Sequence, residues 1–192
     1  MNAEQTKVRN IVDVAFSSAA MTRVFEKGSD DKIKRKFHQI IPQIASSKNE
    51  KDFKRLHDRF CRWFMKNIKT AERKKGRKVI KESISASYGQ GAKVLNVALT
   101  VYVYYCYLPD RETAKRTTKW LHAAIDTKML KHLKENWGGF SANSIEHVDE
   151  ETYFELQKLV RKDIIKKKDE FPKGICPVEW EDIMWRKLNK EE

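Results

Sequence analysis

Basic side chains recur at every third or fourth position from residue 51 onward, and this spacing constrains the fold more than any other feature of the chain. They are Lys51, Arg55, Arg59, Arg62, Lys66, Lys69, Arg73 and Arg77. Apolar residues with the same period, from Phe53 to Ala71, lie nearly opposite them on a helix of about 100° per residue. We therefore predict one long amphipathic helix that begins after an Asn49 N-cap, ends near Gly76 and packs its apolar side inward.

This helix lies in the part of the chain that carries its net charge. Residues 32–81 hold 18 Lys and Arg against 4 Asp and Glu, whereas residues 1–31 sum to −1 and residues 82–192 to 0, within a total of +13. An ordinary solvated helix face mixes charges of both signs, because like charges at i, i+4 repel. We therefore favour a nucleic-acid surface over a plain solvated face or an anionic membrane surface. The residues assigned to it are Arg55, Arg59, Arg62, Lys66, Lys69 and Arg73.

The remaining pattern predicts an all-α fold of about eight helices. The chain has 192 residues, four Pro and seven Gly, so helix breakers are few. We expect it to form a single domain over 1–192, or two interleaved helical lobes with a cleft between them. The helical core would cover about 5–135, and a C-terminal helical segment, about 149–188, would pack back on this core. Further helices are predicted over 5–27, from Ser29 or Asp30 to a break near Pro42, over about 92–107 after a polar turn at 83–91, after Asp110, from Asp126 to Gly138, over 149–168 and over 178–188.

Cysteine usage and hydropathy restrict the class of protein. Cys61, Cys106 and Cys176 are far apart and odd in number, which favours a reducing compartment and offers no zinc or iron–sulfur spacing. No cleavable apolar signal opens the chain, and the most apolar run, 94–108, is too short to span a bilayer. We expect an intracellular protein of the cytoplasm, nucleoid or nucleus, with no metal, no cofactor, no membrane partner and no obligate protein partner.

One segment departs from this helical pattern and points to chemistry. Gly89, Gln90 and Gly91 predict a tight turn directly before a helix, where backbone N–H groups can approach a phosphate. Lys93 then falls in the first turns of the most apolar helix, where a lysine either extends its amine to water or has a lowered pKa and serves as a nucleophile. Asp126 ends an apolar run at the start of another helix. It is an N-cap, or an N-cap that also supplies a functional carboxylate.

Together these segments resemble the helix-hairpin-helix DNA glycosylases over residues 88–132. Gly89, Gly91, Lys93 and Leu99 match the glycine-rich hairpin, and Ile125-Asp126-Thr127 matches the acidic segment; Ser87-Tyr88 replaces the usual Leu-Pro. The separation of 33 residues between Lys93 and Asp126 is nearest to the archaeal 8-oxoguanine branch. The resemblance implies a glycosylase/lyase for damaged bases or abasic sites. Lys93 would then be the Schiff-base nucleophile, Asp126 its activating carboxylate, and Gly89, Gln90 and Gly91 part of the DNA contact.

Two other readings remain open. Arg116 and His122 fit an R-x5-H pattern similar to the metal-independent HEPN ribonucleases, although His122 stands among apolar residues as a core histidine would. Alternatively the basic helix binds nucleic acid without catalysis, and Lys93 and Asp126 form a structural pair. DNA is favoured over RNA as the partner. The glycosylase reading requires that the basic stripe and the Gly89–Lys93 segment border the same groove.

Overall fold

A computed structural model of the chain describes residues 2–18, 24–76 and 78–189. Within these residues the fold is predominantly α-helical with one short antiparallel hairpin, which confirms the predicted all-α class. Its eight α-helices are α1 (Ala3–Ser18), α2 (Ser29–Ala45), α3 (Glu50–Asn67), α4 (Tyr88–Leu99), α5 (Arg111–Thr118), α6 (Thr127–Trp137), α7 (Glu150–Lys166) and α8 (Pro177–Asn189). The hairpin consists of β1 (Arg73–Lys75) and β2 (Lys78–Lys81).

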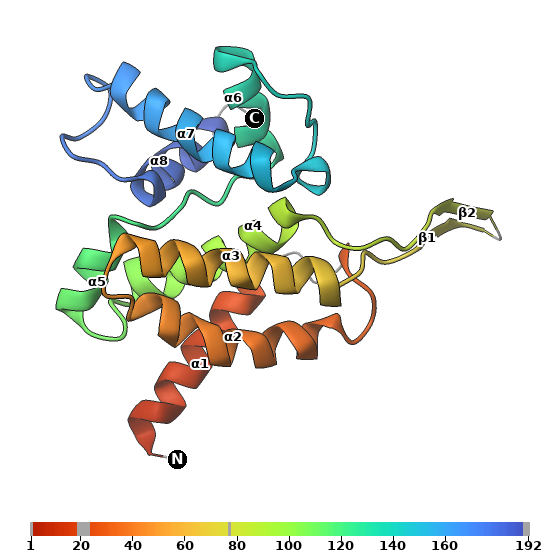
Figure 1. Ribbon diagram of the computed structural model, residues 1–192, viewed down its shortest axis with the longest axis horizontal. Helices are drawn as coiled ribbons and strands as arrows, with labels where there is room; N and C mark the ends of the chain where they lie inside the picture. The colour runs from red at the N-terminus through yellow and green to blue at the C-terminus, as the bar shows by residue number, and fades with distance from the viewer. Residues whose placement is uncertain (1, 19–23, 77, 190–192) are drawn as a thin grey trace.

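The helices form two groups that share one core. In Figure 1, α1 to α5 lie together, α6 to α8 form a second group beside α4, and an irregular segment at 119–126 connects them. Helix α3 packs on α4, and its side chains Phe53, Phe60 and Phe64 are completely buried. Buried apolar side chains from both groups, including Val160 of α7 and Trp180 of α8, belong to the same continuous cluster.

The basic helix is shorter than its sequence pattern predicts. Helix α3 begins at the predicted N-cap, where the Asn49 side chain accepts a hydrogen bond from the Asp52 N–H at 2.9 Å, but it ends at Asn67 instead of near Gly76. Ile68 is already extended, with φ −117° and ψ 136°. The chain then enters a two-stranded ribbon, because Lys69 and Thr70 bridge to Ser85 and Phe25, and Gly76 provides a turn at φ 61°. Lys69 and Arg73 therefore leave the helical stripe, and Arg77 lies outside the described residues.

Helix α4 begins earlier than predicted and absorbs the glycines of the expected turn. The Ser87 hydroxyl accepts the Gln90 N–H at 3.1 Å, and the Gln90 carboxamide oxygen accepts the Ser87 N–H at 2.9 Å. This capping box starts the helix at Tyr88, so Gly89 and Gly91 lie in its first turns. After Leu99 the chain continues as a π-helical segment, η2 (Thr100–Tyr105).

Two of the other predicted helix starts are confirmed, and the second helix differs. Asp110 and Asp126 each accept the backbone N–H of the residue three positions later, at 2.9 and 2.8 Å. The first predicted helix ends at Ser18 in the described part, and residues 19–23 lie outside it. Helix α2 is capped by Gly28 at φ 85° rather than by Ser29 or Asp30. It also continues three residues past Pro42, which removes only one hydrogen bond so close to the helix end.

Candidate nucleic-acid interface

The basic stripe of α3 faces solvent but is partly neutralised. Arg55, Arg59, Arg62 and Lys66 are all exposed. Arg55 lies 3.2 Å from a carboxylate oxygen of Asp52, and Arg62 pairs with Asp58 at 3.0 Å and with Glu150 of α7 at 2.7 Å. Within the described residues no carboxylate lies within 4.0 Å of Arg59 or Lys66. These two keep their charge available for an external anion.

A basic groove between α2 and α3 extends this surface. It measures about 260 Å³ and is lined by Lys32, Arg35, Lys36 and Gln39 of α2 and by Trp63 and Asn67 of α3. The Lys36 ammonium nitrogen lies 5.4 Å from the centre of the half-buried Trp63 ring. None of the three cations has a carboxylate partner among the residues that the structure describes. The α2 cations lie in the basic segment 32–81, but only the packing of α2 beside α3 shows that they form one site with Trp63.

We define the groove face as the surface formed by these α2 cations, by Trp63, and by the two α3 cations next to Trp63. Arg59 and Lys66 are four residues before and three residues after Trp63, so all three share one side of the helix. The members of the groove face are Lys32, Arg35, Lys36, Arg59, Trp63 and Lys66.

The hairpin carries the rest of the basic segment away from the body. Arg73 pairs with Lys81, Lys74 with Val79, and Lys75 with Lys78, with a bulge after Arg73. Residues 73–76 and 78–80 are exposed, and Lys81 at the base of the hairpin forms an ion pair with Glu146. Figure 1 shows the hairpin projecting from the end of the molecule where α3 ends and α2 begins. The groove face and the hairpin are therefore neighbouring parts of one basic surface.

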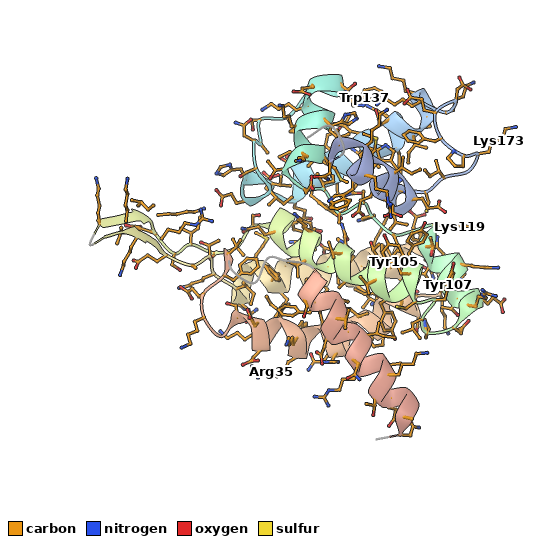
Figure 2. The ribbon with its side chains drawn as sticks, turned by 180° about the vertical axis from the view of Figure 1, so that it is seen from behind. Arg35, Tyr105, Tyr107, Lys119, Trp137 and Lys173 are labelled. Carbon is orange, nitrogen blue, oxygen red and sulfur yellow. The ribbon has the colours of Figure 1, made fainter. Side chains whose placement is uncertain are left out.

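Other cations lie at the far end of the molecule. Figure 2 shows Lys119 and Lys173 at the end opposite the hairpin, while Arg35 projects from the edge of α2. Lys119 follows α5, and Lys173 belongs to the loop between α7 and α8. Both are exposed. They provide a reference surface of like charge outside the groove face.

The predicted phosphate contact at 89–91 lies inside the fold. Gly89, Gln90 and Gly91 are buried. The Gly89 N–H donates to the Val148 carbonyl at 2.9 Å, and the Gly91 N–H donates to the Ser87 carbonyl at 3.2 Å. A Cβ on Gly89 would lie 2.6 Å from the Val148 Cβ, so glycine allows a close approach between segments here. These backbone amides have intramolecular partners and are not presented to a ligand.

The contact at Gly91 shows which side of α3 the start of α4 meets. A Cβ on Gly91 would lie 2.9 Å from the Phe64 Cβ, so the start of α4 packs on the buried side of α3, whereas the stripe occupies its solvent side. At the edge between them, Asp58 pairs with Arg62 of the stripe at 3.0 Å and accepts a hydrogen bond from the Tyr88 hydroxyl at 3.3 Å. A groove shared by the stripe and Lys93 stays a prediction.

Lys93 and Asp126 instead converge on a third residue, Glu181 of α8. The Glu181 carboxylate accepts the Ala124 N–H at 2.8 Å. The pKa of Glu181 is raised to about 8, chiefly by burial and also by the charges of Asp182 and Asp126, whereas the Ala124 hydrogen bond and the Lys93 charge lower it. Both predicted residues are thus close enough to act on one carboxyl group. No direct ion pair forms between Lys93 and Asp126 within the described residues.

The two buried histidines belong to a closed polar network. His57 donates from Nε2 to the Asn96 carboxamide oxygen at 2.8 Å, and the Asn96 amide donates to the Tyr153 hydroxyl at 3.0 Å. The Tyr153 hydroxyl in turn donates to His122 Nδ1 at 2.7 Å. His57, Asn96, His122 and Tyr153 are each no more than 3 % exposed.

Burial lowers the pKa of His57 to about 4 and that of His122 well below its ordinary value, so both rings are neutral at pH 7. Arg116 is exposed on α5, whereas His122 is 3 % exposed and bonded within the network. The structure therefore does not present the two members of the R-x5-H pattern together at a surface. The network has the properties of a packing element between α3, α4 and α7.

Neither the comparisons nor the remaining side chains add a further site. Comparison of the chain with protein-family models, with curated proteins and with solved structures finds no match. In the described parts of the chain, no group of three or more His, Cys, Asp and Glu side chains is arranged to hold a metal ion. No helix of these parts is both long and apolar enough to cross a membrane.

Proposed function

We propose that this protein binds nucleic acid through the groove face and the adjoining hairpin. The observation that carries the proposal is the set of cations around Trp63 that have no carboxylate partner among the described residues. Helix faces normally compensate their own charge, and α3 does so at Arg55 and Arg62. The cations of the groove face have no such carboxylate partners, so we expect an external polyanion to neutralise their charge.

The chemistry of the groove suits a phosphate backbone with bases close by. Lysine and arginine neutralise phosphates and release condensed counterions, which gives affinity that falls steeply with salt. The half-buried Trp63 indole offers a flat surface on which a base can stack once the Lys36 ammonium, 5.4 Å from the ring centre, moves to a phosphate. The proposed activity is binding without bond cleavage, because the groove face consists of Lys, Arg and Trp side chains, with no carboxylate or histidine among them to act as a catalytic acid or base.

A salt titration tests this function. We would measure binding of a 24-base-pair duplex by fluorescence anisotropy between 50 and 250 mM KCl, for the wild type and for the triple variant Lys32→Ala, Arg35→Ala, Lys36→Ala. If each of the three cations contacts one phosphate, the slope of log K against log salt becomes less negative by about 2.7. The matched control is Lys119→Ala, Lys168→Ala, Lys173→Ala, which removes the same charge from exposed sites away from the groove face.

The control separates a site from an effect of net charge. The proposal predicts that the control variant keeps the wild-type slope and loses little affinity. Equal losses in both variants would show that overall charge, and not the groove face, drives binding. Absence of wild-type binding at 50 mM salt would overturn the proposed function itself.

A second candidate function is a DNA glycosylase/lyase, and the convergence on Glu181 favours it. Lys93 and Asp126 both act on this carboxyl group, whose pKa is raised to about 8 by burial. A carboxylic acid that is protonated at neutral pH is a proton donor of the kind that departing bases need. In this reaction the Lys93 amine would attack the sugar C1′ and the bond to the base would break. The burial of Gly89, Gln90 and Gly91 counts against it, because the amides of Gly89 and Gly91 are bonded within the protein and not presented to DNA.

Borohydride trapping tests the second candidate. Reduction of a Schiff base between Lys93 and C1′ leaves a stable secondary amine, which appears as a protein–DNA adduct on a denaturing gel. We would use duplexes with 8-oxoguanine, uracil or an abasic site. An adduct that disappears in Lys93→Ala and persists in Lys131→Ala, an exposed lysine of α6, would support the lyase. No adduct on any lesion, together with intact salt-dependent binding, would refute the lyase and leave nucleic-acid binding as the proposed function.

A further inference from the structure

The hairpin exposes aliphatic side chains in a strongly basic setting. Val79 and Ile80 are 39 % and 59 % exposed, although both are β-branched residues that ordinarily help to form a core. Val79 pairs with Lys74 across the ribbon, and Ile80 is the unpaired extra residue of the bulge, between the Val79–Lys74 and Lys81–Arg73 pairs. The bulge therefore presents two consecutive aliphatic side chains among lysines.

A free ribbon of this composition is poorly stabilised in water. A two-stranded hairpin is marginally stable by itself, and Lys75 directly opposite Lys78 adds repulsion between like charges. In Figures 1 and 2 the strands project away from the helices, so the helices do not cover their faces. The partner that suits this surface has a dense negative charge and apolar groups between the charges.

The base of the hairpin is held firmly by the body. Thr70 forms an isolated bridge with Phe25, Lys69 forms one with Ser85, and the Thr70 N–H donates to the Ile84 carbonyl at 2.8 Å. The Phe25 ring packs edge-on against Phe64 of α3, with ring centres 5.2 Å apart. Because these contacts fix where the ribbon leaves the core, its direction is set before any ligand binds.

We propose that the β1–β2 hairpin is an arm that enters the major groove of B-form DNA, with Val79 and Ile80 against thymine methyl groups. This inference rests on the proposed nucleic-acid binding and names its ligand and contact mode. The lysines on both edges would then face the phosphates along the groove walls.

The dimensions of the arm favour DNA over double-stranded RNA. The major groove of B-DNA, about 12 Å wide, admits a two-stranded ribbon, whereas the deep groove of A-form RNA is too narrow for side-chain access. From Ala71, whose N–H still donates to the Val24 carbonyl of the body, to the tip at Gly76, an extended strand spans about 16 Å, which exceeds the groove depth of about 8.5 Å. Thymine also offers the only methyl group at the base edges in that groove, and aliphatic side chains are its natural contacts.

The experiment compares thymine with uracil in otherwise identical duplexes. Replacing thymine by deoxyuridine removes the methyl groups and leaves charge and hydrogen bonding unchanged. We expect wild-type affinity for an A·T-rich duplex to fall about fourfold for each methyl group in contact. The variant Val79→Ser, Ile80→Ser should bind the thymine duplex more weakly, with an unchanged salt slope, and should not distinguish the two duplexes. Ile165→Ser, at a position 72 % exposed on α7, is the matched control and should behave as the wild type.

The outcomes separate the arm from the underlying function. Wild-type protein that binds both duplexes equally, or whose arm variant keeps the preference for thymine, would overturn the arm while leaving nucleic-acid binding in place. Displacement by netropsin would place the arm in the minor groove. Equal affinity for duplex RNA would contradict entry of the arm into the major groove of B-form DNA. Binding to phosphatidylserine vesicles that is lost in the arm variant, with no duplex effect, would assign the arm to a membrane surface. Absence of any salt-dependent nucleic-acid binding would instead refute the proposed function.

Discussion

Acidification is expected to destabilise this fold through His57. The ring is 1 % exposed and donates to Asn96 at 2.8 Å. Burial lowers the pKa of His57 to about 4, although the Asn96 hydrogen bond and the Asp58 charge act in the opposite direction. In the unfolded chain the pKa of a histidine is about 6.5. Between these two values the unfolded state binds a proton that the folded state does not, so the free energy of unfolding decreases as the pH falls.

The size of the effect follows from the two pKa values. A change from pH 7.5 to pH 5 costs about 2 kcal/mol of stability for His57. His122 acts in the same sense, because burial, followed by the charges of His57 and Arg161, lowers its pKa well below the ordinary value. Glu181 acts in the opposite sense. Its pKa is raised by burial to about 8, so its contribution to stability is lost as the pH rises through that value.

Because these groups oppose one another, the test is a difference between variants. Urea unfolding of the wild type and of His57→Gln would be compared at pH 7.5, 6.5, 5.5 and 5.0. The variant is less stable at pH 7.5, but its disadvantage should shrink by about 2 kcal/mol at pH 5, because glutamine does not titrate. His147→Gln, at a side chain that is 66 % exposed, should follow the wild-type curve. Parallel curves for wild type and His57→Gln would refute the reasoning.

Three substitutions test other parts of the structure. Gly91→Ala would place a Cβ 2.9 Å from the Phe64 Cβ, so we expect a net loss of about 1–2 kcal/mol in urea unfolding despite the better helix propensity of alanine. Asp163→Asn would remove the buried carboxylate that accepts two indole N–H groups and lies 3.3 Å from the Lys167 ammonium, and should lower the free energy of unfolding by about 3 kcal/mol at pH 7. Glu181→Gln should remove the loss of stability between pH 5 and pH 8 that the raised pKa of this glutamate imposes on the wild type; the thermal unfolding midpoint, followed by circular dichroism, would show it.

Local signals in the sequence predicted the helices well. The N-caps at Asn49, Asp110 and Asp126 depend only on a side chain and the backbone N–H three positions later, so they can be read from the chain alone. The end of α3 could not be predicted this way. Residues 68–70 keep the helical charge period, but pairing with Phe25 and Ser85, which are distant in the chain, draws the backbone into a ribbon.

The candidate site was only partly accessible from sequence for similar reasons. The exposed cations of α3 follow from periodicity, but the groove face needs the antiparallel packing of α2, and periodicity does not specify which helices are neighbours. The glycines at 89 and 91 show a different ambiguity. A glycine can provide unusual backbone freedom or simply the absence of a side chain. Here the second property is used, because an added Cβ would lie 2.6 Å from the Val148 Cβ at Gly89 and 2.9 Å from the Phe64 Cβ at Gly91.

The buried network has a consequence for how the chain folds. Its partners come from far apart: the Tyr153 hydroxyl lies 3.3 Å from His57 across 96 residues, and the Asn96 amide donates to the Ala123 carbonyl at 3.1 Å. A nascent chain that ends near residue 120 would hold His57 and Asn96 without the hydroxyl that completes their hydrogen bonding. The entropic cost of closing so long a loop must be met before these contacts form. The first five helices are therefore expected to wait for α7, and the two groups of helices to reach their native state in one cooperative step.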